Sequence, residues 1–391
     1  MTQSTAQLSV PAESAQPALS HQAGSAARAV VDLAALRHNV AALRASLRAE
    51  SRLIAVVKAD AYGHGAAACA AAALDAGADA LAVGRVGEGL ALRGLGIDVP
   101  ILVLGHCTDG ETEPAVAAGL TLTPSNAASL DAVAAVADRL RRPAALHVKV
   151  DTGMRRLGLA PAAAARVIAM TRAHPGLRLM GIYTHFACAD DPDPTRTEQQ
   201  FRRFREFAAT VDPDHALTWH VCNTAAARRF PHMHLDAVRT GIGLYGVDPV
   251  AAQAPPIGLR PALSLRAGIL RCFDLAPGES LGYGATFIAD RPLRIATVAC
   301  GYADGLPRAL SNRGEALVRG RRCPIVGRVS MDLCTIDVSA VDGASPADEV
   351  VFIGDQGAAT LSADEVAGCA DTISYELLCS ISARVRRTYT G

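Results

Sequence analysis

The chain has 391 residues, which is long for one domain and predicts two. Half of its residues are hydrophobic, and Lys plus Arg equals Asp plus Glu at 38 each. This balance of charge gives no reason to expect nucleic acid or an anionic membrane surface as a partner. The sequence also contains no run of about 20 apolar residues, the length needed to span a membrane.

Residues 1–28 are rich in Ala, Ser and Gln. They lack the basic region and the continuous apolar core of a signal peptide. We therefore expect a disordered N-terminal tail and a cytoplasmic protein.

From residue 30 onward, short apolar runs alternate with Ala-rich helical stretches such as 66–76 and 126–140. Eight buried runs alternating with helices over about 230 residues predict a (β/α)8 barrel over residues 29–259. A doubly wound open sheet is the alternative. The predicted strands are 53–58, 80–83, 101–104, 120–123, 146–150, 179–185, 218–222 and 237–245.

The pattern changes after a Pro-rich stretch at 254–261. Short strands separated by Gly, Pro and Asp predict a mainly antiparallel β domain over residues 260–391. The expected strands are 264–273, 294–298, 315–318, 324–329, 334–337 and 349–353, and a helical run follows at 362–366. The ten cysteines include no C-x-x-C pair, which favours reduced thiols and no metal site.

Reactive groups in such a barrel lie where its strands end. Lys58 ends an apolar run. A desolvated lysine becomes a good amine nucleophile, although its ammonium could equally reach solvent at the rim. Arg156 follows a Gly turn and suits a carboxylate or a phosphate, although a surface ion pair would also explain it. His185 could stack on a flat ring, act as an acid or base, or fill the core.

The seventh run ends at Asn223 and Thr224 before a helix, and the eighth carries Arg239 before Gly241. Loops after strands 7 and 8 are the usual phosphate site of these barrels, whereas helix capping alone would also explain Thr224. An imine-forming lysine beside a phosphate pocket fits pyridoxal phosphate, and a phosphosugar aldolase could present the same parts.

Nine segments in order resemble the alanine racemase family and cover residues 30–387. They are AVVKADAYGHG, KVDTGMRRLG, GIYTHFACAD, CNTAA, VRTGIGLYG, LGYGATF, GYADG, GRVSMD and ISYE. The resemblance implies a barrel followed by a β domain. It also implies that L-alanine and D-alanine are interconverted by two-base proton abstraction from a pyridoxal 5'-phosphate aldimine, which supplies D-alanine for peptidoglycan.

The resemblance implies a role for each matching residue. Lys58 would hold the cofactor and act as the base for the D-enantiomer, and Tyr283 would be the opposite base. His185 would pack against the pyridine ring, and Arg239 would keep the pyridine nitrogen unprotonated. The residues expected around the cofactor and its phosphate are Tyr62, Asn223, Thr224, Gly241, Ile242 and Tyr375.

Arg156 would bind the substrate carboxylate or the phenolic oxygen of the cofactor, and Lys149 is a candidate for carbamylation. The family forms head-to-tail homodimers with shared active sites. Tyr283 and Met331 would therefore come from the partner, together with the entrance residues Tyr302 and Asp332. This chain departs from some relatives at Ser330, Arg155 and Arg386, which places local contacts in doubt rather than the reaction.

Three alternatives remain. A fold-related decarboxylase of basic amino acids is one, but the chain lacks that family's β-domain cysteine motif. A cofactor-binding homeostasis protein would resemble the barrel alone. A racemase of broad specificity would be expected to be exported.

Overall fold

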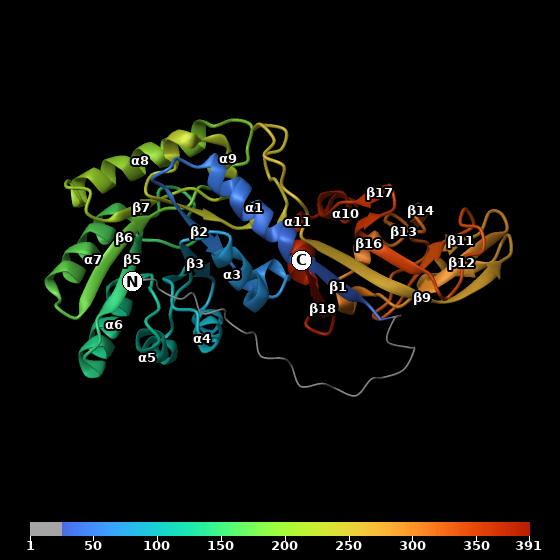
Figure 1. Ribbon diagram of the computed structural model, residues 1–391, viewed down its shortest axis with the longest axis horizontal. Coiled ribbons are helices and arrows are strands. Elements are labelled where there is room, and N and C mark those ends of the chain that lie inside the picture. The colour runs from blue at the N-terminus through green and yellow to red at the C-terminus, as the bar shows by residue number, and fades with distance from the viewer. Residues whose placement is uncertain (1–25) are drawn as a thin grey trace, which may run out of the picture.

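The described chain, residues 26–391 of a computed structural model, forms a barrel and a mainly antiparallel β domain (Figure 1). The tail expected over residues 1–28 lies largely outside the described residues. For its last residue the expectation is wrong, because Arg28 begins the first strand, β1 (Arg28–Asp32).

Seven parallel strands surround the barrel core, and a short segment completes the ring. One sheet has the order β4-β3-β2-β8 and the other β5-β6-β7. The predicted strand 120–123 joins them only through the pairs Leu102–Thr121 and Leu122–Leu146. Arg239 N donates to Cys222 O at 3.0 Å and closes the ring. The strands are β2 (Arg52–Val56), β3 (Ala80–Val83), β4 (Ile101–Val103), β5 (Ala144–Lys149), β6 (Leu177–Tyr183), β7 (Thr218–His220) and β8 (Ala237–Thr240).

Helices cover the outside of the barrel, and polar caps set where several begin. The Asp32 carboxylate accepts a hydrogen bond from Ala35 N, and Asn126 caps α6 in the same way. The outer helices are α1 (Leu33–Ser46), α3 (Ala66–Asp75), α4 (Val86–Gly94), α5 (Asp109–Ala117), α6 (Ala127–Leu140), α7 (Pro161–Ala173), α8 (Thr195–Val211) and α9 (Thr224–Arg229). The short α2 (Lys58–Tyr62) differs from them, because its backbone is left-handed.

The β domain is built on a sheet with the order β14-β13-β16-β9-β1-β18. Its elements are β9 (Leu263–Leu275), β10 (Ser280–Leu281), β11 (Phe287–Ile288), β12 (Leu293–Val298), β13 (Glu315–Val318), β14 (Arg321–Pro324), β15 (Cys334–Asp337), β16 (Glu349–Gln356), β17 (Ala359–Leu361), α10 (Ala363–Cys369), α11 (Ser374–Ser380) and β18 (Arg386–Thr390).

Two boundaries differ from the sequence-based expectation. The barrel was expected to begin at residue 29, but β1 pairs with β9 and β18 and therefore belongs to the β-domain sheet. The strand expected at 324–329 lies earlier in the chain, as β14 (Arg321–Pro324). Gly327 adopts a φ of 75°, which is incompatible with an extended strand through residue 329.

Candidate active site

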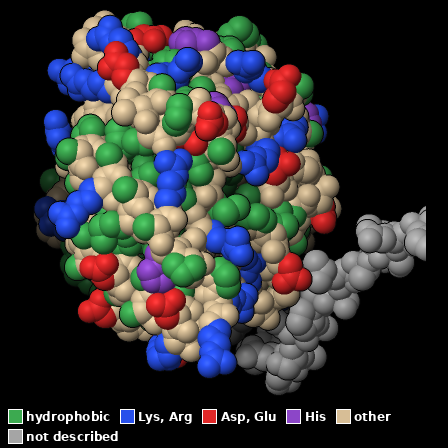
Figure 2. All heavy atoms as spheres, turned by 90° about the vertical axis from the view of Figure 1, so that its left-hand side faces the viewer, with side chains coloured by type: hydrophobic (Ala, Val, Ile, Leu, Met, Phe, Trp, Pro, Cys, Tyr) green, Lys and Arg blue, Asp and Glu red, His purple; other side chains and the backbone are tan. Residues whose placement is uncertain are grey.

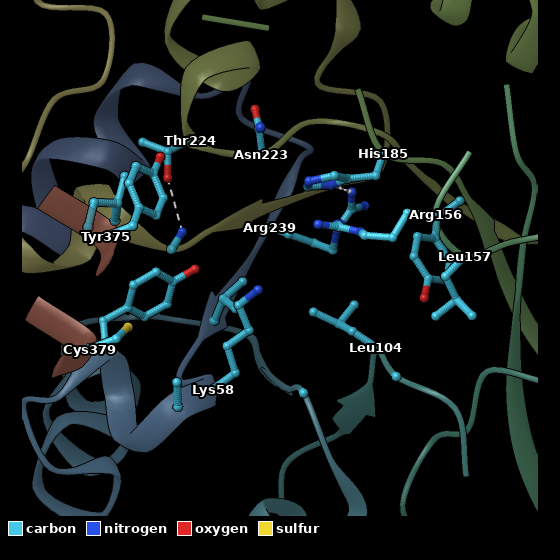
Figure 3. Close-up of a pocket in the computed structure, with 18 of the residues that line it drawn as sticks. Lys58, Leu104, Arg156, Leu157, His185, Asn223, Thr224, Arg239, Tyr375 and Cys379 are labelled. Atoms are coloured by element: carbon cyan, nitrogen blue, oxygen red, sulfur yellow. Dashed lines mark hydrogen bonds between the residues drawn. The ribbon is translucent and has the colours of Figure 1, made fainter. Parts of the chain in front are cut away.

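A cavity of about 590 Å³ lies where the barrel strands end, and α11 of the β domain borders it (Figure 3). It gathers eleven of the fifteen residues that the sequence singled out: Lys58, Tyr62, Lys149, Arg156, His185, Asn223, Thr224, Arg239, Gly241, Ile242 and Tyr375. The remaining four, Tyr283, Tyr302, Met331 and Asp332, do not line it. Sequence reasoning missed further lining residues, among them Leu104, Tyr183 and Cys379.

Lys58 begins an unusual turn. The four residues after it, Ala59 to Tyr62, all have φ between 52° and 54°, the left-handed region. Such a conformation costs an L-residue roughly 1–2 kcal/mol, so surrounding contacts must hold the turn in place. Glu88 supplies some of them, because its carboxylate accepts hydrogen bonds from Ala59 N at 2.6 Å and Gly84 N at 2.7 Å. No sequence motif pointed to Glu88.

Ala59→Gly is expected to stabilise the protein by on the order of 1 kcal/mol, because glycine relieves the left-handed strain at this exposed position. The matched control is Ala67→Gly in α3, which should destabilise by about 1 kcal/mol. Denaturant midpoints measure both changes. A loss of stability in Ala59→Gly similar to that of Ala67→Gly would contradict the inference that the backbone at Ala59 is strained.

The cavity is strongly cationic. Lys58, Lys149, Arg156 and Arg239 line it, and no Asp or Glu among residues 26–391 does. Burial and the nearby Arg156 lower the pKa of Lys58. Burial, with the charges of Arg239 and Arg156, lowers the pKa of Lys149 to about 8. Both amines are therefore more easily deprotonated than a free lysine, and the site favours an anionic ligand.

Arg239 is buried, and protein acceptors hold it in place. Its Nη1 donates to His220 Nδ1 at 2.6 Å and to His220 O at 2.9 Å. Its Nη2 donates to Thr184 O at 2.8 Å and to Val221 O at 3.1 Å. Only Nε–H then lacks an acceptor among residues 26–391. Beside it, burial and the Arg239 charge hold the pKa of His185 well below its ordinary value, so this ring is neutral.

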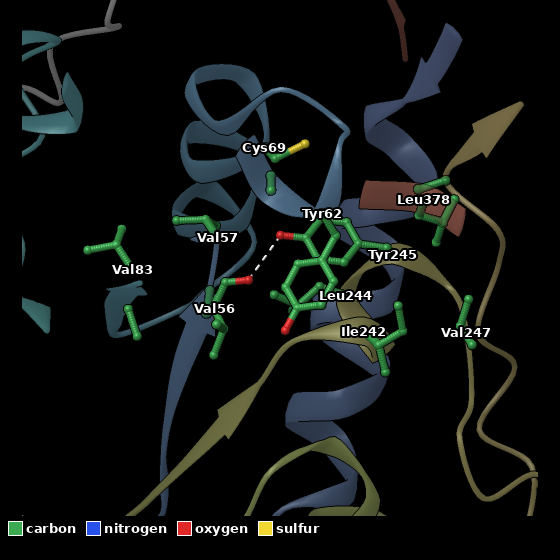
Figure 4. Packing of buried hydrophobic residues seen from close by; sticks show 14 of the residues in the cluster. Val56, Val57, Tyr62, Cys69, Val83, Ile242, Leu244, Tyr245, Val247 and Leu378 are labelled. Carbon is green, nitrogen blue, oxygen red and sulfur yellow. Dashed lines mark hydrogen bonds between the residues drawn. The ribbon is translucent and has the colours of Figure 1, made fainter. Parts of the chain in front are cut away.

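Polar groups converge at the opposite end of the cavity, next to α11 (Figure 3). Thr224 Oγ1 accepts a hydrogen bond from Gly241 N at 3.0 Å, so its own hydrogen remains available for an anion. A Cβ at Gly241 would lie 2.4 Å from the Tyr62 hydroxyl, so any larger residue would displace that hydroxyl. Tyr62 packs against Tyr245, whose hydroxyl donates to Val56 O at 3.0 Å (Figure 4).

Asn223 has a simpler structural role than the others. Its side chain accepts a hydrogen bond from Ala226 N at 2.9 Å and caps α9. The cap orders the turn that carries Thr224.

The four residues outside the cavity lie on the β domain with exposed side chains. Tyr283 is 71% exposed, and Met331 is 55% exposed. Tyr302 N donates to Ser330 O at 3.0 Å, and Arg384 pairs with Asp332 at 2.8 Å. Large apolar side chains left in solvent in this way are typical of a surface that another molecule covers.

The fold and the cavity together define a barrel with a lysine of lowered pKa in a cationic pocket. The chain belongs to the alanine racemase family and is an isomerase of that family. The family's N-terminal domain matches residues 31–249, and its C-terminal domain matches residues 262–389.

Individual relatives cover almost the whole chain. The alanine racemase of Desulfosudis oleivorans is 43% identical, over 92% of this chain and 96% of its own length. The alanine racemase of Symbiobacterium thermophilum is 44% identical, over 93% of this chain and 97% of its own length. Among solved structures, the alanine racemase from D-cycloserine-producing Streptomyces lavendulae has a TM-score of 0.90 at 36% identity and covers 95% of this chain and 98% of its own. The biosynthetic alanine racemase of Pseudomonas aeruginosa has a TM-score of 0.84 at 41% identity and covers 94% of this chain and 100% of its own.

Other kinds of site find little support in the described residues. No cluster of three His, Cys, Asp or Glu side chains in residues 26–391 is placed to hold a metal ion. In the same range no helix has the length and apolarity to cross a membrane. The face of the barrel farthest from the β domain carries acidic and basic side chains interspersed (Figure 2).

Proposed function

We propose that this protein interconverts L-alanine and D-alanine with pyridoxal 5'-phosphate bound in the cationic cavity. The observation that carries the proposal is the position of Lys58, in a pocket that residues 26–391 line with three further cations and no carboxylate. When bound, the cofactor withdraws electrons from the α-carbon of an attached amino acid and makes its α-proton acidic.

The residues present fit this cofactor. The residues that would bind its phosphate all line the cavity: Tyr62, Thr224, Gly241, Ile242 and Tyr375. Lys58 Nζ would hold its other end covalently. The Nε–H of Arg239 would face the ring nitrogen, and because arginine stays protonated, that nitrogen would remain unprotonated.

Two bases would act on opposite faces of the substrate. Lys58, whose pKa is lowered, would exchange the α-proton of D-alanine. The partner subunit's Tyr283 would exchange that of L-alanine. Arg156 and the backbone N–H of the partner subunit's Met331 would orient the substrate carboxylate.

A head-to-tail homodimer would place these groups together. Within one chain Tyr283 is exposed and does not line the cavity, so a second copy is the natural source of the opposite base. Tyr302 and Asp332 would then form the entrance, and a site narrowed by Tyr302 and Tyr375 would prefer alanine over larger amino acids. The product would supply D-alanine for peptidoglycan in the cytoplasm.

The direct test is turnover by the purified protein with added cofactor. L-alanine should yield D-alanine, and D-alanine should yield L-alanine, with no carbon dioxide released. Carbon dioxide from ornithine or lysine would indicate a decarboxylase, and cofactor binding without turnover would indicate a binding protein. Equal turnover of lysine or arginine would contradict the preference for alanine.

Lys149 is expected to carry a carbamate. Its pKa of about 8 provides neutral amine, which adds to carbon dioxide with loss of a proton, and the neighbouring Arg156 and Arg239 stabilise the resulting anion. A ¹³C NMR spectrum of protein in ¹³C-labelled bicarbonate should show the carbamate. At fixed dissolved carbon dioxide, the signal should grow as pH rises through about 8. The control is Lys149→Met, of similar length and without an amine. An identical spectrum from the control would contradict the modification.

A further inference from the structure

A chain of hydrogen bonds runs inward from Arg239 to the far end of the barrel. His220 Nδ1 on β7 accepts from Arg239, and His220 Nε2 lies 2.7 Å from His147 Nδ1 on β5. The two histidines are on strands that flank β6, so the contact must pass over β6. Gly181 makes this possible, because a Cβ there would lie 2.7 Å from His147 Cε1 and 2.6 Å from Thr218 O.

The donors and acceptors of this chain can be arranged in only one way when both imidazoles are neutral. A guanidinium can only donate, so His220 Nδ1 must be free of hydrogen. His220 then carries its hydrogen on Nε2 and donates it to His147 Nδ1. Burial lowers the pKa of His147 to about 3 and that of His220 well below its ordinary value, so both stay neutral at working pH.

The opposite tautomer of His220 would disrupt the site. It would set an N–H of the ring against an N–H of the guanidinium at a separation of 2.6 Å. Arg239 would have to rotate, and its free Nε–H would leave its present direction. The Nε2–H of the correct tautomer finds its acceptor in His147 Nδ1, because Tyr183 contacts the other side of His220 only through its ring face, at 4.7 Å and 9°.

We infer that His147 is a positioning residue for the reaction: its Nδ1 accepts the Nε2–H of His220 and so stabilises the His220 tautomer that holds Arg239 with Nε–H facing the cofactor site. This rests on the proposed function, in which Arg239 faces the ring nitrogen. His147 touches neither substrate nor cofactor, and it acts through His220 alone.

The location of His147 allows the inference to be tested by substitution. It borders a second cavity of about 330 Å³ at the opposite end of the barrel strands, together with Arg52, Thr121 and Thr218. A change of side chain at this wall leaves no enclosed void in a packed core. The pair His147→Asn and His147→Leu is nearly isosteric, and only the asparagine offers an oxygen where Nδ1 now accepts.

Two measurements on these variants test the inference. His147→Leu should lower kcat at least about tenfold with a smaller change in KM, whereas His147→Asn should stay within about threefold of the wild type. In ¹⁵N-histidine-labelled protein without cofactor, His220 Nδ1 should show the shift of an unprotonated ring nitrogen in the wild type and in His147→Asn. In His147→Leu, a mixture of the two tautomers should appear.

Each outcome has a distinct meaning. A protonated His220 Nδ1 in the wild type would overturn the inference without any variant, even if His147→Leu failed to fold. Equal kcat values for the two variants would also overturn it, because a packing role does not distinguish an oxygen from a methyl group. If the wild type fails to racemise alanine, the proposed function is contradicted. The NMR measurement would still test the His220 tautomer, because it needs neither cofactor nor turnover.

Discussion

Lys58→Ala and Tyr283→Phe are each expected to lower racemisation by at least about 10²- to 10⁴-fold, with opposite selectivity between the enantiomers. In deuterated water, Tyr283→Phe should lose α-proton exchange mainly from L-alanine. Lys58→Ala should lose it mainly from D-alanine, since Lys58 lies inside the cavity where the substrate would bind. The phenylalanine keeps the aromatic ring of Tyr283, so the loss of exchange in this variant measures the contribution of the hydroxyl group alone.

Lys58→Arg controls for simple loss of charge. The guanidinium keeps a cation in the cavity but cannot give up a proton at working pH, so this variant should be as inactive as Lys58→Ala. Exchange rates followed by NMR separate the two half-reactions. Equal losses from both enantiomers in the two single variants would contradict the assignment of one base to each face.

Mixing two inactive variants is expected to restore activity. If each site combines Lys58 of one subunit with Tyr283 of the other, a hybrid of Lys58→Ala and Tyr283→Phe contains one intact site and one site lacking both bases. Random reassociation of equal amounts makes half of the dimers hybrids, so activity should recover to about a quarter of the wild type. Each variant mixed with itself is the control.

The recovery depends on exchange of subunits, which provides a second check. Activity should appear at the rate of dimer exchange and rise with time after dilution and reconcentration. A mixture that exchanges subunits, as shown by mass spectrometry, but stays inactive would contradict the shared site. In that case Tyr283 would have no role in the partner's cavity.

Much of the cavity could be predicted because its residues are at strand ends. Lys58 and His185 each follow the end of a buried strand and Arg239 lies within the last two residues of β8, and parallel strands bring such ends together. The contribution of Tyr375 needed the family resemblance, since it comes from α11 in another domain. The apolar segment 120–123 predicts a full strand, but in the structure it pairs with its neighbours only through two isolated β-bridges.

Other features were not readable from local patterns. The left-handed turn at residues 59–62 contains no glycine, so backbone propensity argues against it, and only tertiary contacts such as those of Glu88 maintain it.

The position of His147 could have been noticed in the sequence: it lies two residues before Lys149, on the same face of β5. Its link to His220 depends on Gly181, a long-range coincidence that no window of sequence reveals.

The place of β1 between β9 and β18 means that the polypeptide crosses between the two domains twice. One crossing is the direct step from β1 into α1, where Asp32 N also bonds Ala262 O at 2.8 Å. The other is the segment that follows β8, where Arg260 N donates to Asn39 at 2.7 Å. Two covalent tethers restrict hinge motion between the domains more than a single tether would. It also follows that a fragment beginning at residue 262 would lack an inner strand of its own sheet.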